Sequence, residues 1–227
     1  MRITRIAVQE RNPSRRNLYV DEAFALGIGT ETLLRFGLRA GDEISHETLR
    51  EIEKTEELVN ARGAALRYLG VRPRTEQEIR DKLREKEFGD EEIAQTISGL
   101  KTAGLINDQE FARMYVRDAM LKHPAGALML RRKLLILGVD RATVDQAITE
   151  TLSTVNLEET ALALARAFIR KTRNLRPGET PRRLRTRVSS YLGRRGFSWD
   201  LIQSTLKAAL PGSSDSDEQE DSDVPVT

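Results

Sequence analysis

The chain has 227 residues, of which 39% are hydrophobic and 32% charged, and its formal net charge at pH 7 is +2. It contains no cysteine, which excludes disulfides, thiolate catalysis and cysteine-based zinc sites. No secretory leader and no apolar run near the ~20 residues of a membrane span is visible, so we expect a cytoplasmic protein that does not enter a membrane.

The N-terminal segment is predicted to contain β-strands followed by helices. Hydrophobic and β-branched residues alternate with polar ones over residues 1–29, and Asn12-Pro13-Ser14 is typical of a turn between strands. Thr30 is expected to cap a short helix, and Ser45 to open a longer charged helix. Residues 1–60 should therefore form a β-hairpin plus helices.

From residue 61 the hydrophobic pattern is repeated three times. When Leu83, Leu134 and Leu192 are aligned, hydrophobic residues stand at positions −4, 0, +5, +10 and +14 of every copy. The matched residues are Ile79, Leu83, Phe88, Ile93 and Ile97, then Leu130, Leu134, Val139, Val144 and Ile148, then Val188, Leu192, Phe197, Ile202 and Leu206. The pattern Ala-x-x-aromatic-aliphatic precedes each copy, so we predict three units of three helices.

Turn and capping residues agree with this spacing. Gly138 and Gly196 fall where a helix end favours a left-handed residue, whereas the first copy has Glu87 there. The expected N-caps and helix starts are Asp90, Asp140 and Ser198, the capping box Thr75 to Glu78, its analogue Asn107 to Glu110, and Thr180-Pro181. The expected helices are 62–70, 76–87 and 91–103, then 108–121, 126–137 and 141–152, then 157–173, 181–195 and 199–209.

The predicted fold class is all-α, an elongated array of tandem three-helix repeats with a small N-terminal β/helical segment and a disordered acidic tail. The expected domains are 1–60, 61–106 for the first repeat, 107–156 for the second, 157–210 for the basic third repeat, and 211–227 for the tail. The sequence leaves open whether the units stack as a solenoid or form a bent, flexible arm.

The charges are distributed unevenly along the chain. Residues 160–210 carry a net charge of +10, residues 211–227 carry −6, and residues 1–159 carry −2. Such asymmetry predicts a polyanionic or acidic partner. The tail is either a solubilising terminus or a mimic of phosphates that shields the third repeat.

No catalytic, cofactor or metal site is predicted. His46 and His123 lie far apart, without metal-ligand spacing, and no phosphate-binding loop is present. Gly27-Ile28-Gly29 lacks the rest of a dinucleotide fingerprint. We therefore expect a protein that is not an enzyme.

The basic residues are the candidate binding groups. Arginine side chains can hold two oxygens of a phosphate or carboxylate at once. Candidate contacts with a partner or with DNA are Arg72, Arg74, Arg131, Arg132, Lys133, Arg170, Lys171, Arg182, Arg183, Arg185, Arg187, Arg194 and Arg195. Tyr191 and Trp199 are candidates for base stacking, whereas Phe197 is a core position.

Two stretches of the chain resemble the RecX family of regulatory proteins. They are Ala64-Ala65-Leu66-Arg67-Tyr68-Leu69 with Arg72-Pro73-Arg74-Thr75-Glu76-Gln77-Glu78-Ile79, and Gly104-Leu105-Ile106-Asn107-Asp108-Gln109-Glu110-Phe111-Ala112. The openings Ile3-Thr4-Arg5-Ile6 and Tyr19-Val20-Asp21-Glu22 are also similar. The likeness covers residues 1–210. The apolar start Leu128-Met129-Leu130, the arginine-rich third repeat and the acidic tail depart from the family pattern.

The resemblance implies a negative regulator of RecA that lies in the groove of the RecA–single-stranded-DNA filament. Such a regulator lowers ATP hydrolysis, strand exchange and coprotease activity in recombination, DNA repair and the SOS response, by capping or by disassembly. We expect a monomer, which can also contact single- or double-stranded DNA through residues 160–210. A stand-alone nucleic-acid-binding protein of helix-turn-helix type is the alternative.

Overall fold

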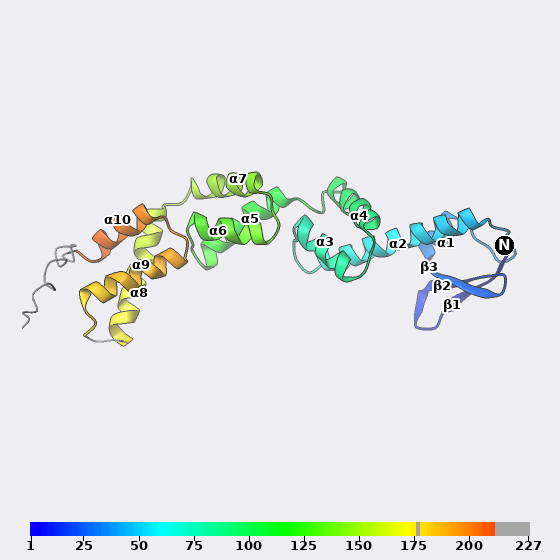
Figure 1. Cartoon of the computed structure of the whole chain (residues 1–227), viewed down its shortest axis with the longest axis horizontal. Helices are drawn as coiled ribbons and strands as arrows, with labels where there is room; N and C mark the ends of the chain where they lie inside the picture. The colour runs from blue at the N-terminus through cyan, green and yellow to red at the C-terminus, as the bar shows by residue number, and fades with distance from the viewer. Residues whose placement is uncertain (176–177, 212–227) are drawn as a thin grey trace, which may run out of the picture. The chain divides into compact units, whose positions relative to one another are not determined.

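The computed structural model describes residues 1–175 and 178–211, which form ten helices and one sheet. Their order along the chain can be followed in Figure 1. The chain divides into two compact units, Met1–Asn107 and Asp108–Thr227. The expected disordered tail lies, from residue 212 onward, outside the described residues.

The N-terminal segment contains strands, as the alternating pattern predicted, but they form a three-stranded antiparallel sheet in the order β1-β2-β3 rather than a single hairpin. Its strands are β1 (Ile3–Gln9), β2 (Asn12–Val20) and β3 (Ala23–Gly29). The turn expected at Asn12-Pro13-Ser14 is wrong, because Gln9 pairs with Asn12 and the chain reverses at residues 10 and 11. The amide and hydroxyl of Ser14 both donate to Asn12 Oδ1, at 3.3 and 2.6 Å, so these residues form the start of β2.

Helix α2 (His46–Leu69) is shared between two hydrophobic cores. Ser45 caps it as expected, since its Oγ accepts a hydrogen bond from the Thr48 amide at 2.9 Å. Ile52 is buried in the core of the sheet, whereas Ala61 and its neighbours are buried in the core of the first repeat. The expected helix 62–70 is thus the last part of a longer one. The short helix α1 (Thr30–Arg35) is capped by Gly29, so the cap expected at Thr30 is wrong.

The remaining helices form the three repeats (Figure 1). They are α3 (Glu76–Glu85), α4 (Asp90–Thr102), α5 (Asp108–Lys122), α6 (Ala127–Ile136), α7 (Arg141–Leu152), α8 (Leu157–Leu175), α9 (Pro181–Arg194) and α10 (Trp199–Ala209). In each repeat the first helix packs against the third and the second lies across them; in the first repeat α2 supplies the first helix.

Each repeat has its own hydrophobic core, and the repeated register defines it. All the aligned positions are buried except Phe88, which is half-buried. Three clusters result, one per repeat, and the buried members of each belong to that repeat; Leu157 at the start of α8 packs against both the second and the third. Thin units of this kind need fewer apolar residues than one thick core, which explains the high share of charged residues. The predicted three-helix repeats are confirmed.

The turn between the second and third helices needs a left-handed residue in every repeat. Gly138 and Gly196 have φ of 82° and 80°, as expected from their position after a helix end. Glu87 adopts the same conformation with φ of 64°, although it has a Cβ. The first repeat therefore carries backbone strain that the other two avoid.

Capping is confirmed in part. Thr75 and Glu78 form the capping box, and Asp140 accepts a hydrogen bond from the Thr143 amide at 3.0 Å. Ser198 is the N-cap of α10 without a side-chain hydrogen bond. The cap expected at Asp90 is wrong, because α4 begins at Asp90 and Gly89 precedes it.

Replacing Glu87 by glycine should stabilise the first unit. The left-handed conformation costs a residue with a Cβ about 1–2 kcal/mol, and glycine gives back about 0.5–1 kcal/mol through its larger loss of backbone entropy. We expect a net gain of about 0.5–1 kcal/mol, measured as a higher thermal midpoint by calorimetry. Glu87→Ala keeps the strain and is the control. A lower midpoint for the glycine variant than for the alanine variant would contradict this account.

Candidate interaction surface

The candidate basic residues fall into two groups in the structure. One group is engaged in hydrogen bonds, ion pairs or ring contacts within the chain. The other is exposed, with no hydrogen bond or ion pair among the described residues. This difference matters because a guanidinium that already holds a carboxylate is less available to a partner.

Arg72 and Arg74 belong to the engaged group. Their guanidinium groups contact the Glu78 carboxylate at 2.6 and 3.2 Å, and Arg74 also lies 4.0 Å from the ring centroid of Tyr68. Burial opposes ionisation of Glu78, but hydrogen bonds from Arg72, the Thr75 amide and Arg74 outweigh it and lower the pKa of the Glu78 carboxyl. These contacts tie the start of α3 to the end of α2.

The Glu78→Gln variant should be destabilised more at neutral pH than in acid. A carboxyl with a lowered folded pKa contributes stability above its unfolded pKa of about 4, and this stability is lost as the pH falls through the folded value. We expect a loss of about 1 kcal/mol at pH 7 and a smaller loss at pH 3. Denaturant unfolding at the two pH values measures it, with the exposed Glu57→Gln as control. An equal loss at both pH values would contradict the assignment.

Four further candidates are held within the second unit. Arg131 contacts Asp145 at 2.6 Å and Arg187 contacts Glu179 at 3.3 Å. Arg185 donates to Gln203 Oε1 at 3.4 Å. Arg195 donates to the Pro124 carbonyl at 2.7 Å. The binding roles of these residues stay predictions.

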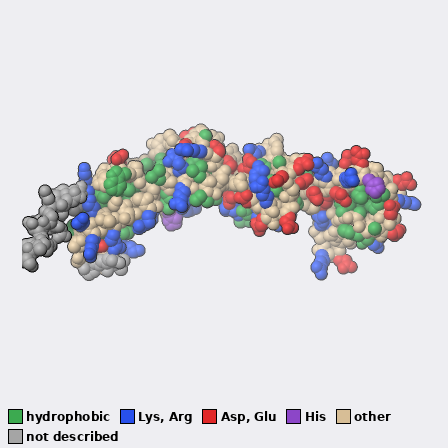
Figure 2. All heavy atoms as spheres, viewed as in Figure 1, with side chains coloured by type: hydrophobic (Ala, Val, Ile, Leu, Met, Phe, Trp, Pro, Cys, Tyr) green, Lys and Arg blue, Asp and Glu red, His purple; other side chains and the backbone are tan. Residues whose placement is uncertain are grey.

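The exposed group lies on the second and third repeats. It comprises Arg132, Lys133, Arg170, Lys171, Arg182, Arg183 and Arg194, none of whose side chains has a hydrogen bond or ion pair within residues 1–175 and 178–211. Figure 2 shows Lys and Arg side chains predominating over α8 to α10, whereas Asp and Glu side chains are frequent over the first unit. The exposed positive charge is therefore concentrated beyond the first repeat.

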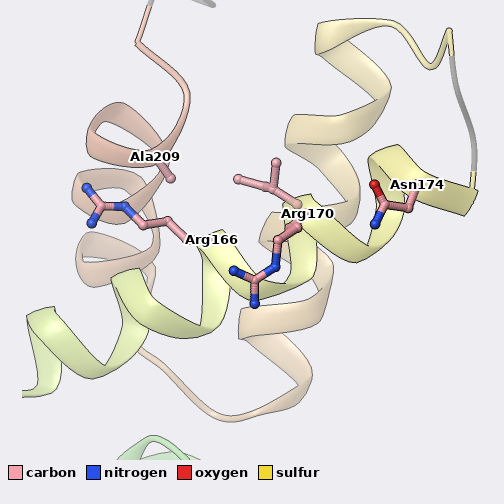
Figure 3. Close-up of a pocket in the computed structure, with 5 residues that line it drawn as sticks. Arg166, Arg170, Asn174 and Ala209 are labelled. Carbon is pink, nitrogen blue, oxygen red and sulfur yellow. The ribbon is translucent and has the colours of Figure 1, made fainter.

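A hollow on the third repeat contains two cations of one helix face (Figure 3). It has a volume of about 310 Å³ and is lined by Arg166, Ile169, Arg170 and Asn174 from α8 and by Ala209 from α10. Arg166 and Asn174 were not among the predicted site residues. Their spacing of four residues from Arg170 on either side is the sequence signal that identifies them.

The aromatic candidates for base stacking differ in access. The Tyr191 ring is stacked on Phe168 with centroids 4.4 Å apart, and Arg195 lies 5.0 Å from the Tyr191 centroid. Phe197 is buried in the core of the third repeat. Trp199 is 66% exposed at the start of α10 and is therefore the most accessible of these rings.

The second and third repeats meet through two glycines. The Gly126 amide donates to the Arg195 carbonyl at 2.8 Å, and the Leu128 amide donates to the Gly196 carbonyl at 3.2 Å. A Cβ on Gly126 would lie 2.1 Å from Gly196 O. The N-terminus of α6, which has no side-chain cap, is thus satisfied by backbone carbonyls of the third repeat.

Among the described residues no group of three or more His, Cys, Asp or Glu side chains is placed to hold a metal ion. Within the same residues no helix combines the length and apolar character needed to cross a membrane.

Four protein-family models together match most of the chain. "Regulatory protein RecX N-terminal domain" matches residues 1–45, and "RecX, first three-helix domain" matches residues 61–100. The second and third three-helix domains of RecX match residues 107–148 and 158–206. The matches agree with the repeats that the hydrophobic register predicted.

Individual proteins give the same result. The chain is 32% identical to a "Regulatory protein RecX" of Bacillus velezensis, over 90% of this chain and 76% of that protein. It is 30% identical to one of Clostridium perfringens, over 91% and 95%. A crystal structure of regulatory protein RecX has a TM-score of 0.71 and 27% identity, covering 90% of this chain and 98% of the other. RecX from Lactobacillus salivarius, with a TM-score of 0.59 and 24% identity over 68% of this chain and 97% of the other, shares the fold.

Proposed function

Because the chain belongs to the RecX family of regulatory proteins, we propose that it is a negative regulator of RecA that binds the RecA–single-stranded-DNA filament. In this proposal it lies in the filament groove and lowers ATP hydrolysis, strand exchange and coprotease activity. It acts as a monomer in the cytoplasm, and it binds rather than catalyses.

The exposed cations of the second and third repeats carry this proposal. Five of them are exposed, and their side chains have no hydrogen bond or ion pair within the described chain: Arg132 and Lys133 on α6, and Arg170, Arg182 and Arg183 on α8 and α9. The buried residues of each repeat form its core, and the exposed cations lie outside these cores, where a partner can reach them. Weak contacts from several repeats on one chain gain affinity through effective concentration.

Sedimentation with preformed filaments tests the proposal. Filaments of RecA from the same organism, assembled on single-stranded DNA with a slowly hydrolysed nucleotide, are pelleted with increasing amounts of the protein. We expect saturable co-sedimentation that exceeds the amount bound by the DNA alone. Recovery of the protein in the supernatant at all filament concentrations would refute the proposal.

A direct contact of the third repeat with DNA is favoured by a second observation. The hollow with Arg166 and Arg170 lies on the same repeat as the exposed Trp199. Cations that track phosphates and an aromatic ring that stacks on a base are the usual means of binding single strands. This contact could recruit the protein to the filament, or operate without RecA.

Reversing three exposed charges on the third repeat tests whether this repeat binds DNA directly. We expect Arg170→Glu, Arg182→Glu and Arg183→Glu together to weaken single-stranded-DNA affinity at least tenfold. The slope of log affinity against log salt should become shallower by about 2, since each phosphate contact contributes roughly 0.7. Fluorescence anisotropy measures both.

The matched control reverses Arg35, Arg50 and Arg62, which are exposed in the first unit. Equal losses of DNA affinity in the two triple variants would show that net charge alone determines binding. Inhibition of RecA ATP hydrolysis that survives the third-repeat reversal would assign regulation to other residues.

A further inference from the structure

Helix α6 exposes three aliphatic side chains on the side opposite its core. Leu128, Leu135 and Ile136 are 57%, 42% and 73% exposed. Their spacing of seven and eight residues places them on one face, and Arg132 lies between them on that face. The buried Leu130 and Leu134 point the other way. The α6 stripe, as we name Leu128, Arg132, Leu135 and Ile136, therefore faces away from the core.

The other repeats show that the fold does not require an apolar residue at these places. In the register that aligns Leu83, Leu134 and Leu192, the three exposed aliphatic residues of α6 correspond to polar residues or glycine. The counterparts are Gln77, Arg84 and Glu85 in α3, and Thr186, Gly193 and Arg194 in α9. Single exposed aliphatic residues are common on proteins, but three on one face of one repeat out of three need a cause outside the core.

The charges of α6 indicate the chemistry of what covers the stripe. The helix has no acidic residue, and its Arg131 is already paired with Asp145 at 2.6 Å. Arg132 within the stripe and Lys133 at its edge are exposed, and their side chains have no hydrogen bond or ion pair among the described residues. A complementary surface presents apolar side chains next to carboxylates. Phosphates would satisfy the cations but leave the aliphatic groups in water, so a protein surface fits better than nucleic acid.

We propose that the α6 stripe is the principal docking surface of this chain for a RecA protomer, and that it binds an apolar, carboxylate-flanked patch of that protomer. The inference rests on the proposed function and assigns its main protein contact to the second repeat. The basic third repeat then supplies electrostatic attraction, while the stripe supplies the apolar contact that fixes the protomer in place.

A variant that gives α6 the residues of α3 tests the inference. Leu128→Gln, Leu135→Arg and Ile136→Glu together leave the net charge unchanged and use residues that the same position tolerates in the first repeat. We expect tenfold to hundredfold weaker binding to preformed filaments, with an unchanged thermal midpoint. Arg132→Glu alone should also weaken binding. Leu34→Gln, at an exposed leucine of α1, is the control and should bind as the parent does.

The outcomes separate this inference from the proposed function. If the parent protein fails to bind filaments, the proposed function falls and the inference with it. If the parent binds and the α6 variant binds equally well, only the inference is overturned. It is also overturned if the variant keeps its filament affinity but loses another property. Loss of self-association, of affinity for anionic vesicles or of affinity for single-stranded DNA would assign the stripe to that other partner. Loss of filament affinity with these other properties retained supports it.

Discussion

The Gly126→Ala variant should lose the contact between the second and third repeats. A Cβ at this position would lie 2.1 Å from Gly196 O and 2.5 Å from Phe197 N, both backbone atoms that cannot rotate away. Overpacking costs about 1–3 kcal/mol, and each lost backbone hydrogen bond adds about 1 kcal/mol. We expect a total loss of about 3–4 kcal/mol at this contact.

Hydrogen exchange of the Leu128 amide measures this loss directly, because that amide donates to Gly196 O at 3.2 Å. Its protection should fall by two to three orders of magnitude. Gly99→Ala is the matched control, since a Cβ there meets no atom within 4 Å and replaces a helical glycine, which should stabilise α4 by about 0.5–1 kcal/mol. Unchanged protection of Leu128 in Gly126→Ala would show that the repeats do not depend on the glycine contact.

This variant also bears on function. The α6 stripe and the cations of α8 and α9 all belong to the second compact unit. The glycine contact joins the two repeats that carry them and so fixes their spacing. When the contact is lost, the two surfaces can no longer engage a filament with a fixed spacing, and their combined affinity should fall. The affinity of the third repeat for single-stranded DNA should remain close to that of the parent.

The Glu56→Ala variant should lose about 3–5 kcal/mol of the unfolding free energy of the first unit. Glu56 is only 3% exposed on α2. Its carboxylate accepts hydrogen bonds from the Gly29 amide at 2.9 Å and the Thr32 hydroxyl at 2.6 Å, and it lies 2.9 Å from Arg15 Nη2. Removing the carboxylate leaves the Gly29 amide and the buried Thr32 hydroxyl without an acceptor, at about 1–3 kcal/mol for each unpaired donor, which accounts for most of the magnitude. Arg15 is 27% exposed and keeps its bonds to Asn60 Oδ1 and the Gly27 carbonyl, so the lost ion pair adds less.

Denaturant unfolding monitored on the first unit measures this effect. Glu53→Ala, an exposed position on the same helix, is the control and should change the stability by less than about 0.5 kcal/mol. A loss below 1 kcal/mol for Glu56→Ala would mean that α2 is held to the sheet by apolar packing alone.

The repeats could be predicted from the sequence because burial imposes a fixed spacing. Leu83, Leu134 and Leu192 are each buried between helices of their own repeat, and residues at the same distances from them meet the same surroundings. Helix starts followed from local chemistry, as at Thr75 and Asp140, where the side chain bonds an amide three residues later. Such interactions span one turn and can be inferred from neighbouring residues.

Features that depend on residues far apart could not be predicted. Gly196 was expected in the turn between two helices and residue 126 at the start of the helix 126–137, and nothing local shows that the backbones of Gly126 and Gly196 touch. The burial of Glu56 depends on β2, β3 and α1 converging on α2. Likewise, Arg131 was predicted to be a binding residue because its ion pair with Asp145, which lies on another helix, cannot be inferred from neighbouring residues.

A titration of this protein into a RecA reaction on single-stranded DNA tests the central claim most directly. The quantity measured is the rate of ATP hydrolysis by RecA. The claim is that exposed side chains of the second and third repeats bind and restrain the RecA filament. It predicts a progressive fall in rate that is complete at or below one chain per RecA protomer. A rate that stays constant well beyond that ratio would contradict it.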